Sequence, residues 1–158
     1  MRNSRSLLDT QNSFGWFSIG MHWFAALAII LLWFVGQSIS LQSVEQIDAR
    51  RSLHITLGLI AWLPLVMRMV WRYKSGHPHV SGQTLLTHRL AKAVHHLMLL
   101  VLAVMLISGP LMAWAMPSRN SLSEFAFIFH SNAAKALAAL VVLHILAALK
   151  HLMFHEDE

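Results

Sequence analysis

Histidines recur at regular spacings within a nearly continuous apolar stretch close to the C-terminus, FHSNAAKALAALVVLHILAALKHLMFH. His130, His144 and His151 are separated by 14 and then 7 residues. Because an α-helix turns by about 100° per residue, these spacings place the three imidazoles in one stripe on one helix face. Ionisable groups avoid lipid, so we expect the stripe to face other helices, where neutral imidazoles can bind a metal such as haem iron.

The composition indicates an integral membrane protein. The chain of 158 residues is 56% hydrophobic and 12% charged, with a mean hydropathy of +0.56. A soluble domain carries about 25% charged residues. The sequence contains no cysteine, which excludes disulfides, thiolate metal ligands, iron–sulfur clusters and covalent haem attachment through a Cys-x-x-Cys-His motif. A net charge of +5 without a basic surface rich in stacking residues predicts no nucleic-acid partner.

Four apolar segments are long enough to cross a membrane as helices. We expect them at about residues 14–36, 52–72, 91–115 and 130–153. Each is close to the ~20 residues that span ~30 Å of hydrocarbon at ~1.5 Å per residue. Pro64 and Pro110 lie inside two of these segments, and we expect kinks there. The predicted fold is an all-α, integral membrane four-helix bundle that forms a single domain over residues 1–158.

The distribution of lysine and arginine predicts the orientation of this bundle. One side would carry the N-terminus, the loop between the second and third segments, and the C-terminus. Its basic residues are Arg2, Arg5, Arg68, Arg72, Lys74, Arg89, Lys92 and Lys150. The other side would carry only Arg50, Arg51, Arg119 and Lys135. Since cytoplasmic loops are enriched in Lys and Arg, both termini are expected in the cytoplasm.

Counting residues from the expected outer ends of the segments sorts six histidines by depth. His22 lies 14 residues before Gly36, and His144 lies 14 residues after His130, which corresponds to about 21 Å along a helix. His54 and His130 begin their segments and would lie just below the outer surface. The expected layers, from the outer to the inner side, are His54 with His130, His22 with His144, and His95 with His151.

Facing imidazoles at two depths predict two b-type haems. Haem iron takes two axial ligands from opposite sides, and a four-helix bundle offers facing side chains around a central slot. The anionic propionates of haem need cationic or polar neighbours. Arg50 and Arg51 are expected near the outer layer because they closely precede His54, whereas Arg68 and Arg72 suit the inner layer or the nearby membrane surface.

Simpler interpretations exist for each of these residues. A single histidine in a membrane helix often donates a hydrogen bond to a neighbouring helix. Arg68 and Arg72 could be topology anchors whose side chains extend to the lipid headgroups. His96 adjoins His95 but points about 100° away on the helix, and packing is the alternative to a functional role.

The sequence resembles the bacterial cytochrome b561 family over about residues 15–155. The segments that carry the resemblance are GMHWFAAL, LHITLGLIAWLPLVMRMVWR, LAKAVHHLMLLVLAVMLISGPLM and FHSNAAKALAALVVLHILAALKHLMF. The resemblance implies a four-helix protein that spans the bacterial inner membrane several times and holds two non-covalent b haems. It implies that His22 and His144 bind the iron of the cytoplasmic-side haem, and that His54 and His130 bind the iron of the periplasmic-side haem. His95 and His151 match positions that the family associates with ubiquinone.

One branch of this family is similar to a superoxide oxidase, in which superoxide gives electrons at the periplasmic side and quinone is reduced at the inner end. A cationic mouth could attract the superoxide anion. The residues that could form it are Arg50, Arg51, Arg119 and Lys135. In the simpler interpretation these charges belong to ordinary loops or pair with propionates.

Three functional hypotheses follow. The first is a di-haem cytochrome that moves electrons across the membrane between a periplasmic donor, for which superoxide is a candidate, and ubiquinone. The second is a haem-bearing membrane anchor that relays electrons between quinone and a partner redox protein. The third, a histidine-based metal or proton transporter, is disfavoured because the apolar segments contain few acidic residues. The first hypothesis would make the chain itself an oxidoreductase, and the second would not. The expected partners are membrane lipid, quinone, and superoxide or a redox protein.

Overall fold

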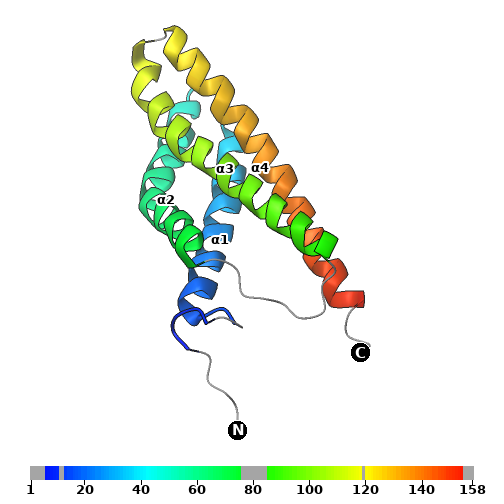
Figure 1. Cartoon of the computed structure of the whole chain (residues 1–158). Helices are drawn as coiled ribbons and strands as arrows, with labels where there is room; N and C mark the ends of the chain where they lie inside the picture. The colour runs from blue at the N-terminus through cyan, green and yellow to red at the C-terminus, as the bar shows by residue number, and fades with distance from the viewer. Residues whose placement is uncertain (1–5, 11–12, 76–84, 119, 155–158) are drawn as a thin grey trace. The chain divides into compact units, whose positions relative to one another are not determined.

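The described part of the chain is helical, as expected for an all-α protein. The computed structural model describes residues 6–10, 13–75, 85–118 and 120–154. Its elements, shown in Figure 1, are α1 (Trp16–Ile39), α2 (Ile47–Ser75), α3 (Leu85–Ala115), the 3₁₀ turn η1 (Met116–Ser118) and α4 (Ser121–Phe154). Each of the four α-helices is long and apolar enough to cross a membrane. The chain is thus an all-α, multi-pass membrane protein.

The helices form two hairpins. α1 packs against α2 in one compact unit, Met1–Gln83, and α3 packs against α4 in a second unit, Thr84–Glu158. The structure describes each hairpin by itself. The expected bundle of four helices and the expected single domain both depend on how the hairpins meet, and both stay predictions. The expected orientation also stays a prediction, and Arg2, Arg5 and Arg119 lie outside the described residues.

The helices extend beyond the apolar segments, and this corrects the expected positions of His54 and His130 within their helices. His54 lies seven residues inside α2 rather than at its beginning, and His130 lies nine residues inside α4. These counts correspond to about 10 and 13 Å of helix. The additional stretches begin with polar residues, although residues 125–129 of α4 are apolar. Asp48 lies in the first turn of α2, where a carboxylate favours the positive helix end, and Asn120 Oδ1 caps α4 by accepting the Ser123 N–H at 3.1 Å. Hydropathy locates the membrane-spanning part of a helix, and capping residues locate its ends.

Within the first hairpin, the contact between helices uses small and polar side chains. Ala25 on α1 and Ala61 and Leu65 on α2 are buried, with exposed fractions of 5% or less. Arg68 lies on the same face of α2, because it follows Ala61 by seven residues and Leu65 by three. Small residues allow membrane helices to approach closely, which gives packing contacts that lipid cannot replace. The face that carries Arg68 therefore belongs to the hairpin contact.

The second hairpin has the same character. Leu102 and Ser108 on α3 are buried, as are Ala126 and Leu137 on α4. His130 lies four residues after Ala126 and seven before Leu137, so it shares their face of α4. Many large apolar side chains of both hairpins point outward instead, as Trp23, Ile107 and Trp114 do with exposed fractions above 60%. Such a surface is compatible with lipid or with another helix pair.

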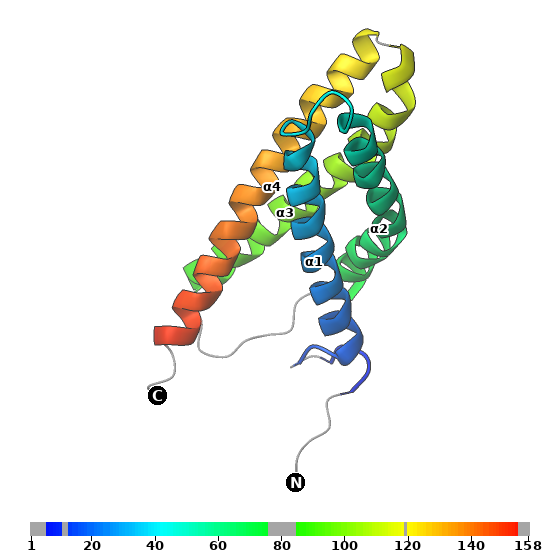
Figure 2. The ribbon, with the colours of Figure 1, turned by 180° about the vertical axis from the view of Figure 1, so that it is seen from behind.

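Both internal prolines are accommodated without ending a helix. α2 continues through Pro64 and α3 continues through Pro110. Figure 2 shows that α2 is bowed along its length, in line with the bend expected where a proline removes a backbone donor from the helix interior.

Candidate functional site

His54 lies against α1 at a position where that helix has no side chain. Its ring packs over Gly36: a Cβ added to Gly36 would lie 3.1 Å from Cε1 and 3.3 Å from Nδ1 of His54. The ring also hydrogen-bonds the backbone of Leu32, four residues earlier on α1. Contacts this short would displace the ring, so the glycine provides the space in which the imidazole lies.

His130 makes an equivalent contact in the second hairpin. Its ring packs over Gly109 of α3, where an added Cβ would lie 3.1 Å from Cε1 of His130. The adjacent residue, Ser108, places its Oγ 3.1 Å from Nδ1 of the same ring. Ser108 is buried, with an exposed fraction of 5%. Two consecutive residues of α3 therefore contact the imidazole, Gly109 near Cε1 and Ser108 at Nδ1.

The two hairpins share a pattern that is hard to detect in the sequence. His22 precedes Gly36 by about four helical turns in α1, and His95 precedes Gly109 by the same interval in α3. In each hairpin the glycine lies against a histidine of the following helix. The two hairpins share so few residue types at equivalent positions that no internal repeat is apparent from the sequence. Only the contacts show that a glycine and a histidine meet in the same way in both hairpins. We refer to these two contacts, Gly36 with His54 and Gly109 with His130, as the histidine–glycine joints.

His22 contacts an arginine of the neighbouring helix. Nη2 of Arg68 lies 2.9 Å from Nδ1 of His22. Arg68 follows His54 on α2 by the same interval, about four helical turns, by which His22 precedes Gly36 on α1. The antiparallel helices therefore stay in register from the histidine–glycine joint to this contact, and His22 lies about 21 Å from the level of His54, as expected. The expected separation of the two depths is thus present within one hairpin.

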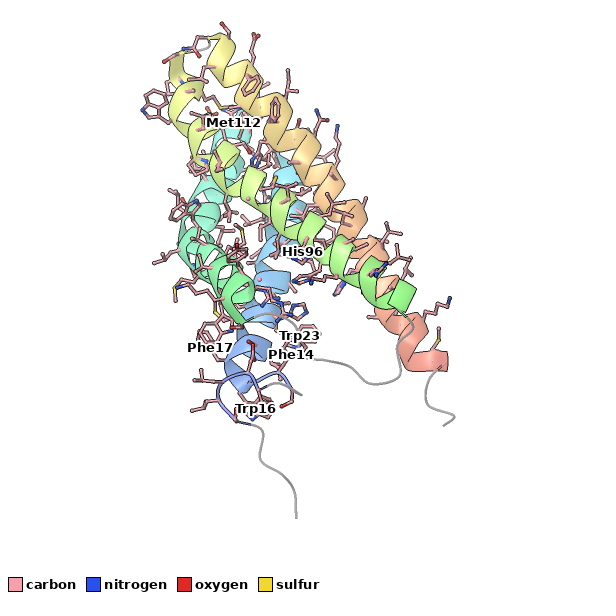
Figure 3. The ribbon with its side chains drawn as sticks, in the orientation of Figure 1. Phe14, Trp16, Phe17, Trp23, His96 and Met112 are labelled. Carbon is pink, nitrogen blue, oxygen red and sulfur yellow. The ribbon has the colours of Figure 1, made fainter. Side chains whose placement is uncertain are left out.

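A second polar contact lies one turn beyond Arg68, where α2 approaches the beginning of α1. Asp9 Oδ2 accepts a hydrogen bond from Ser18 Oγ at 2.7 Å, and Ser18 Oγ in turn accepts one from Trp71 Nε1 at 2.7 Å. Phe17 packs edge-on against Trp71, with ring centres 4.8 Å apart. These contacts connect the segment before α1 to both helices. Phe14, Trp16 and Phe17 gather at this end of α1 in Figure 3.

Arg72 is enclosed by the same end of the hairpin. Its exposed fraction is 5%, and its guanidinium carbon lies 4.9 Å from the centre of the Phe14 ring. Among the described residues, its Nη2 is buried and makes no hydrogen bond. Burial of a charged donor is costly unless it is hydrogen-bonded, so this nitrogen suits an anionic oxygen. Arg68 and Arg72 thus lie one turn apart, with both guanidinium groups inside the first hairpin.

The predicted outer arginines have a different environment. Arg51 Nη1 forms an ion pair with Asp48 Oδ1 at 2.8 Å, and the two side chains are 39% and 82% exposed. Such exposed pairs contribute little to stability. Arg50 is half-buried on the adjacent position of α2. Lys135 lies on α4, in the other hairpin, so the structure does not test the expected cationic mouth.

The register of the second hairpin changes one expected layer. On α3 His95 precedes Gly109, and on α4 His144 follows His130, each by about four helical turns. Because Gly109 lies against His130 and the helices are antiparallel, His95 and His144 reach about the same level. His151 lies seven residues further along α4, about 10 Å beyond. The expected alignment of His95 with His151 does not hold in this register, because it counted depth from a helix start that lies nine residues too late.

The remaining histidines are placed as follows. His95 and His144 are half-buried, and the side chain of His151 lies outside the described residues. His96 is exposed on the N-terminal half of α3 (Figure 3), and its Nδ1 lies 2.6 Å from the Lys92 carbonyl oxygen of its own helix. This contact within α3 gives the His96 ring a hydrogen-bond partner on its own helix. The predicted iron-binding combinations, His22 with His144 and His54 with His130, each join the two hairpins and stay predictions.

Sequence reasoning missed the residues that hold the histidines. Gly36, Gly109 and Ser108 are neither charged nor metal-ligating residue types, and they become significant only when the neighbouring helix is in place. A signal was nevertheless present: the spacing His-x₁₃-Gly occurs in both the first and the third apolar segments. Asp9 was missed because it precedes the first apolar segment, and neither hydropathy nor histidine spacing indicates its contacts.

The sequence is similar to known proteins over almost its whole length. The family model described as prokaryotic cytochrome b561 matches residues 13–157. Among curated proteins, the chain is similar to cytochrome b561 homolog 2 of Escherichia coli (strain K12), with 24% identity over 174 residues that cover 97% of this chain and 92% of that protein. No solved structure matches the chain.

Proposed function

Because this chain belongs to the prokaryotic cytochrome b561 family, a family of haem-containing membrane cytochromes, we propose that it is a di-haem b-type cytochrome that moves electrons across the bacterial inner membrane. The donor we propose is superoxide on the periplasmic side, and the acceptor is ubiquinone. The observation that carries the proposal is the placement of histidines at two levels, about 21 Å apart, in both hairpins. When bound, haem b supplies one-electron oxidation and reduction at its iron.

The outer haem is assigned to His54 and His130. Both imidazoles lie in histidine–glycine joints, and both are held by a hydrogen bond or polar contact from the neighbouring helix. Such contacts fix the orientation of a ligating ring. These joints support the assignment because they give each ring a defined place against the neighbouring helix. Arg50, half-buried beside this level, and Arg51 are the proposed partners of its propionates.

The inner haem is assigned to His22 and His144, which lie about four helical turns, or 21 Å, from the outer level on α1 and α4. His22 fits less directly than the outer ligands. Arg68 donates to its Nδ1, so the ring hydrogen lies on Nε2, and coordination of iron through Nε2 requires Arg68 to release the ring. A propionate offers the guanidinium a stronger, charged acceptor. Arg68 and Arg72 are therefore the proposed propionate partners, and the buried Nη2 of Arg72 supports this role.

The quinone site is assigned to the end of the second hairpin that carries His95 on α3 and His151 on α4. Because His95 shares the level of His144 and His151 lies about 10 Å further on, the two imidazoles would contact different parts of the quinone. Ubiquinone takes up two electrons and two protons to become ubiquinol, and imidazoles are suited to pass protons near neutral pH. Two superoxide anions each lose one electron and become dioxygen, so two superoxide anions reduce one ubiquinone. On this proposal the chain is an oxidoreductase with both termini in the cytoplasm.

The proposal is tested with the purified protein in detergent. Two haems per chain and the formation of one ubiquinol per two superoxide anions consumed would support it. A colourless protein, expressed with ample haem, would contradict the haem assignment. Electron transfer to quinone that occurs only when a second redox protein co-purifies would instead indicate a membrane anchor, and superoxide would then be rejected as the donor.

A further inference from the structure

Ser108 makes two polar contacts that together determine a hydrogen position. Its Oγ lies 2.6 Å from the Val104 carbonyl oxygen, four residues earlier on α3, and 3.1 Å from Nδ1 of His130 on α4. A serine hydroxyl carries one hydrogen, and a carbonyl oxygen can only accept. The hydroxyl hydrogen is therefore committed to Val104. In the second contact, the Ser108 oxygen must accept, and the hydrogen comes from Nδ1 of His130.

This assignment determines the tautomer of His130. A neutral imidazole with its hydrogen on Nδ1 carries its lone pair on Nε2, the nitrogen that then binds a metal. We propose that Ser108 is a positioning residue that holds His130 in the Nδ1–H tautomer and so prepares Nε2 for haem iron. The inference depends on the proposed function, because it concerns how one of the proposed ligands is prepared.

Two further features of the site support this role. Gly109, the next residue of α3, lies close to Cε1 of the same ring and limits its position, while Ser108 contacts its Nδ1. Hydrogen bonds run in series from the His130 ring through the Ser108 hydroxyl to the Val104 carbonyl oxygen. Ser108, in the middle of this series, is buried, and hydrogen bonds in series polarise one another. A more basic imidazole is a stronger ligand and favours the oxidised iron.

The first hairpin has no such serine. Counting from its histidine–glycine joint, the residue before Gly36 is Val35, which offers no hydroxyl, and His54 uses the backbone of Leu32 instead. His22 shows the opposite arrangement, since the guanidinium of Arg68 can only donate to its Nδ1. The serine contact is therefore specific to His130, and removing it should affect one ligand of one haem.

A structural alternative is that Ser108 only bonds the backbone of its own helix, as serine often does in membrane helices. Ser131 provides a matched control, because it adjoins His130 and its hydroxyl bonds the Ile128 carbonyl oxygen of its own helix at 3.3 Å. Ser108→Thr keeps a hydroxyl at the same place, whereas Ser108→Ala removes it.

The experiment compares the holoprotein with its Ser108→Ala, Ser108→Thr and Ser131→Ala variants. Each haem's midpoint potential is measured by redox titration, and haem retention is measured by transfer to apomyoglobin. The haem concerned is identified as the one absent from a His130→Ala variant. We expect Ser108→Ala to raise the potential of that haem alone and to weaken its retention by roughly 10-fold, as loss of such a supporting contact does for metal sites. The other two variants should match the parent protein.

Unchanged potential and retention in Ser108→Ala would overturn the inference, as would an equal change in both haems or a failure of Ser108→Thr to restore the parent values. These outcomes differ from failure of the proposed function. If the parent protein binds no haem, the proposed function fails and the inference fails with it. If the parent binds two haems and Ser108→Ala leaves both unaltered, the inference alone fails.

Discussion

Arg68 donates a hydrogen bond from Nη2 to Nδ1 of His22, across 2.9 Å and between helices α2 and α1. The contact joins a proposed iron ligand to a proposed propionate partner. A guanidinium cannot accept a hydrogen bond, so this arrangement places the ring hydrogen on Nε2. Arg68 can therefore donate hydrogen bonds to two acceptors, the imidazole of His22 and, on the proposed function, a propionate carboxylate. Binding of the inner haem is expected to include an exchange of the first acceptor for the second.

The first prediction concerns the charge of Arg68. Replacing Arg68 by Gln should lower the midpoint potential of the inner haem, because a buried positive charge nearby disfavours the more positive, oxidised iron. A desolvated unit charge contributes on the order of 1 kcal/mol, or about 50 mV, to such an equilibrium. Redox titration of the purified protein measures this shift. Arg51→Gln is the control, since Arg51 is paired with Asp48 at the surface, and an inner-haem potential that moves equally in both variants would contradict the assignment.

The second prediction concerns the ligands themselves. His144→Ala and His54→Ala should each reduce the haem content from two to about one per chain, because each removes one ligand of a different haem. The pyridine haemochrome assay combined with the protein concentration gives this ratio. His96→Ala should retain both haems, since His96 is exposed and contacts the backbone of its own helix. Two haems in the His144→Ala variant would show that the inner level has been misassigned.

The third prediction concerns the histidine–glycine joints. A Cβ at Gly36 or Gly109 would lie 3.1 Å from the histidine ring beside it, so alanine at either position should displace that ring. Overpacking of this kind costs roughly 1–3 kcal/mol. We expect a lower thermal midpoint and weaker retention of the outer haem. Gly20→Ala on α1 is the matched control, because a Cβ there meets nothing within 4 Å and alanine favours the helix by about 0.5–1 kcal/mol.

The fourth prediction concerns Asp9. Its carboxylate accepts the Gly15 N–H and the Ser18 hydroxyl, each at 2.7 Å, and so holds the segment before α1 on the hairpin. Asp9→Ala should cost about 1–3 kcal/mol locally, as charge-assisted hydrogen bonds of this kind do. The measurement is amide hydrogen exchange in the first turn of α1, which should become faster. Glu45→Ala, which removes an exposed carboxylate between α1 and α2, should leave that exchange unchanged, and slow exchange in both variants would exclude this role for Asp9.

Much of the fold could be predicted from hydropathy. All four membrane-spanning helices were located, because about 20 apolar residues in succession have few alternatives in water or lipid. The ends of the helices could not be predicted in the same way. α4 begins at Ser121 because Asn120 caps it, and this polar turn lies outside the apolar segment that was recognised. The error propagated into the depth of His130 and from there into the expected level of His95.

Less of the site could be predicted. The spacing between His130 and His144 was informative because a helix converts it directly into a depth of about 21 Å and a direction. His22 and Arg68 are 46 residues apart in the chain, and their contact depends on the register of the hairpin. In each hairpin the contact between a glycine and a histidine ring shows which residues of the two helices lie side by side. The periodicity of one helix does not indicate which residues of the neighbouring helix it will contact, so this register could not be predicted.

The histidine–glycine joints also bear on how the protein enters the membrane. Each joint is formed by two successive helices, so His54 or His130 is half-buried against a glycine as soon as its own hairpin has closed. The two hairpins can therefore enter the bilayer one after the other with these contacts already made. On the proposed function each haem takes ligands from both hairpins, so haem binding would follow the insertion of the second one.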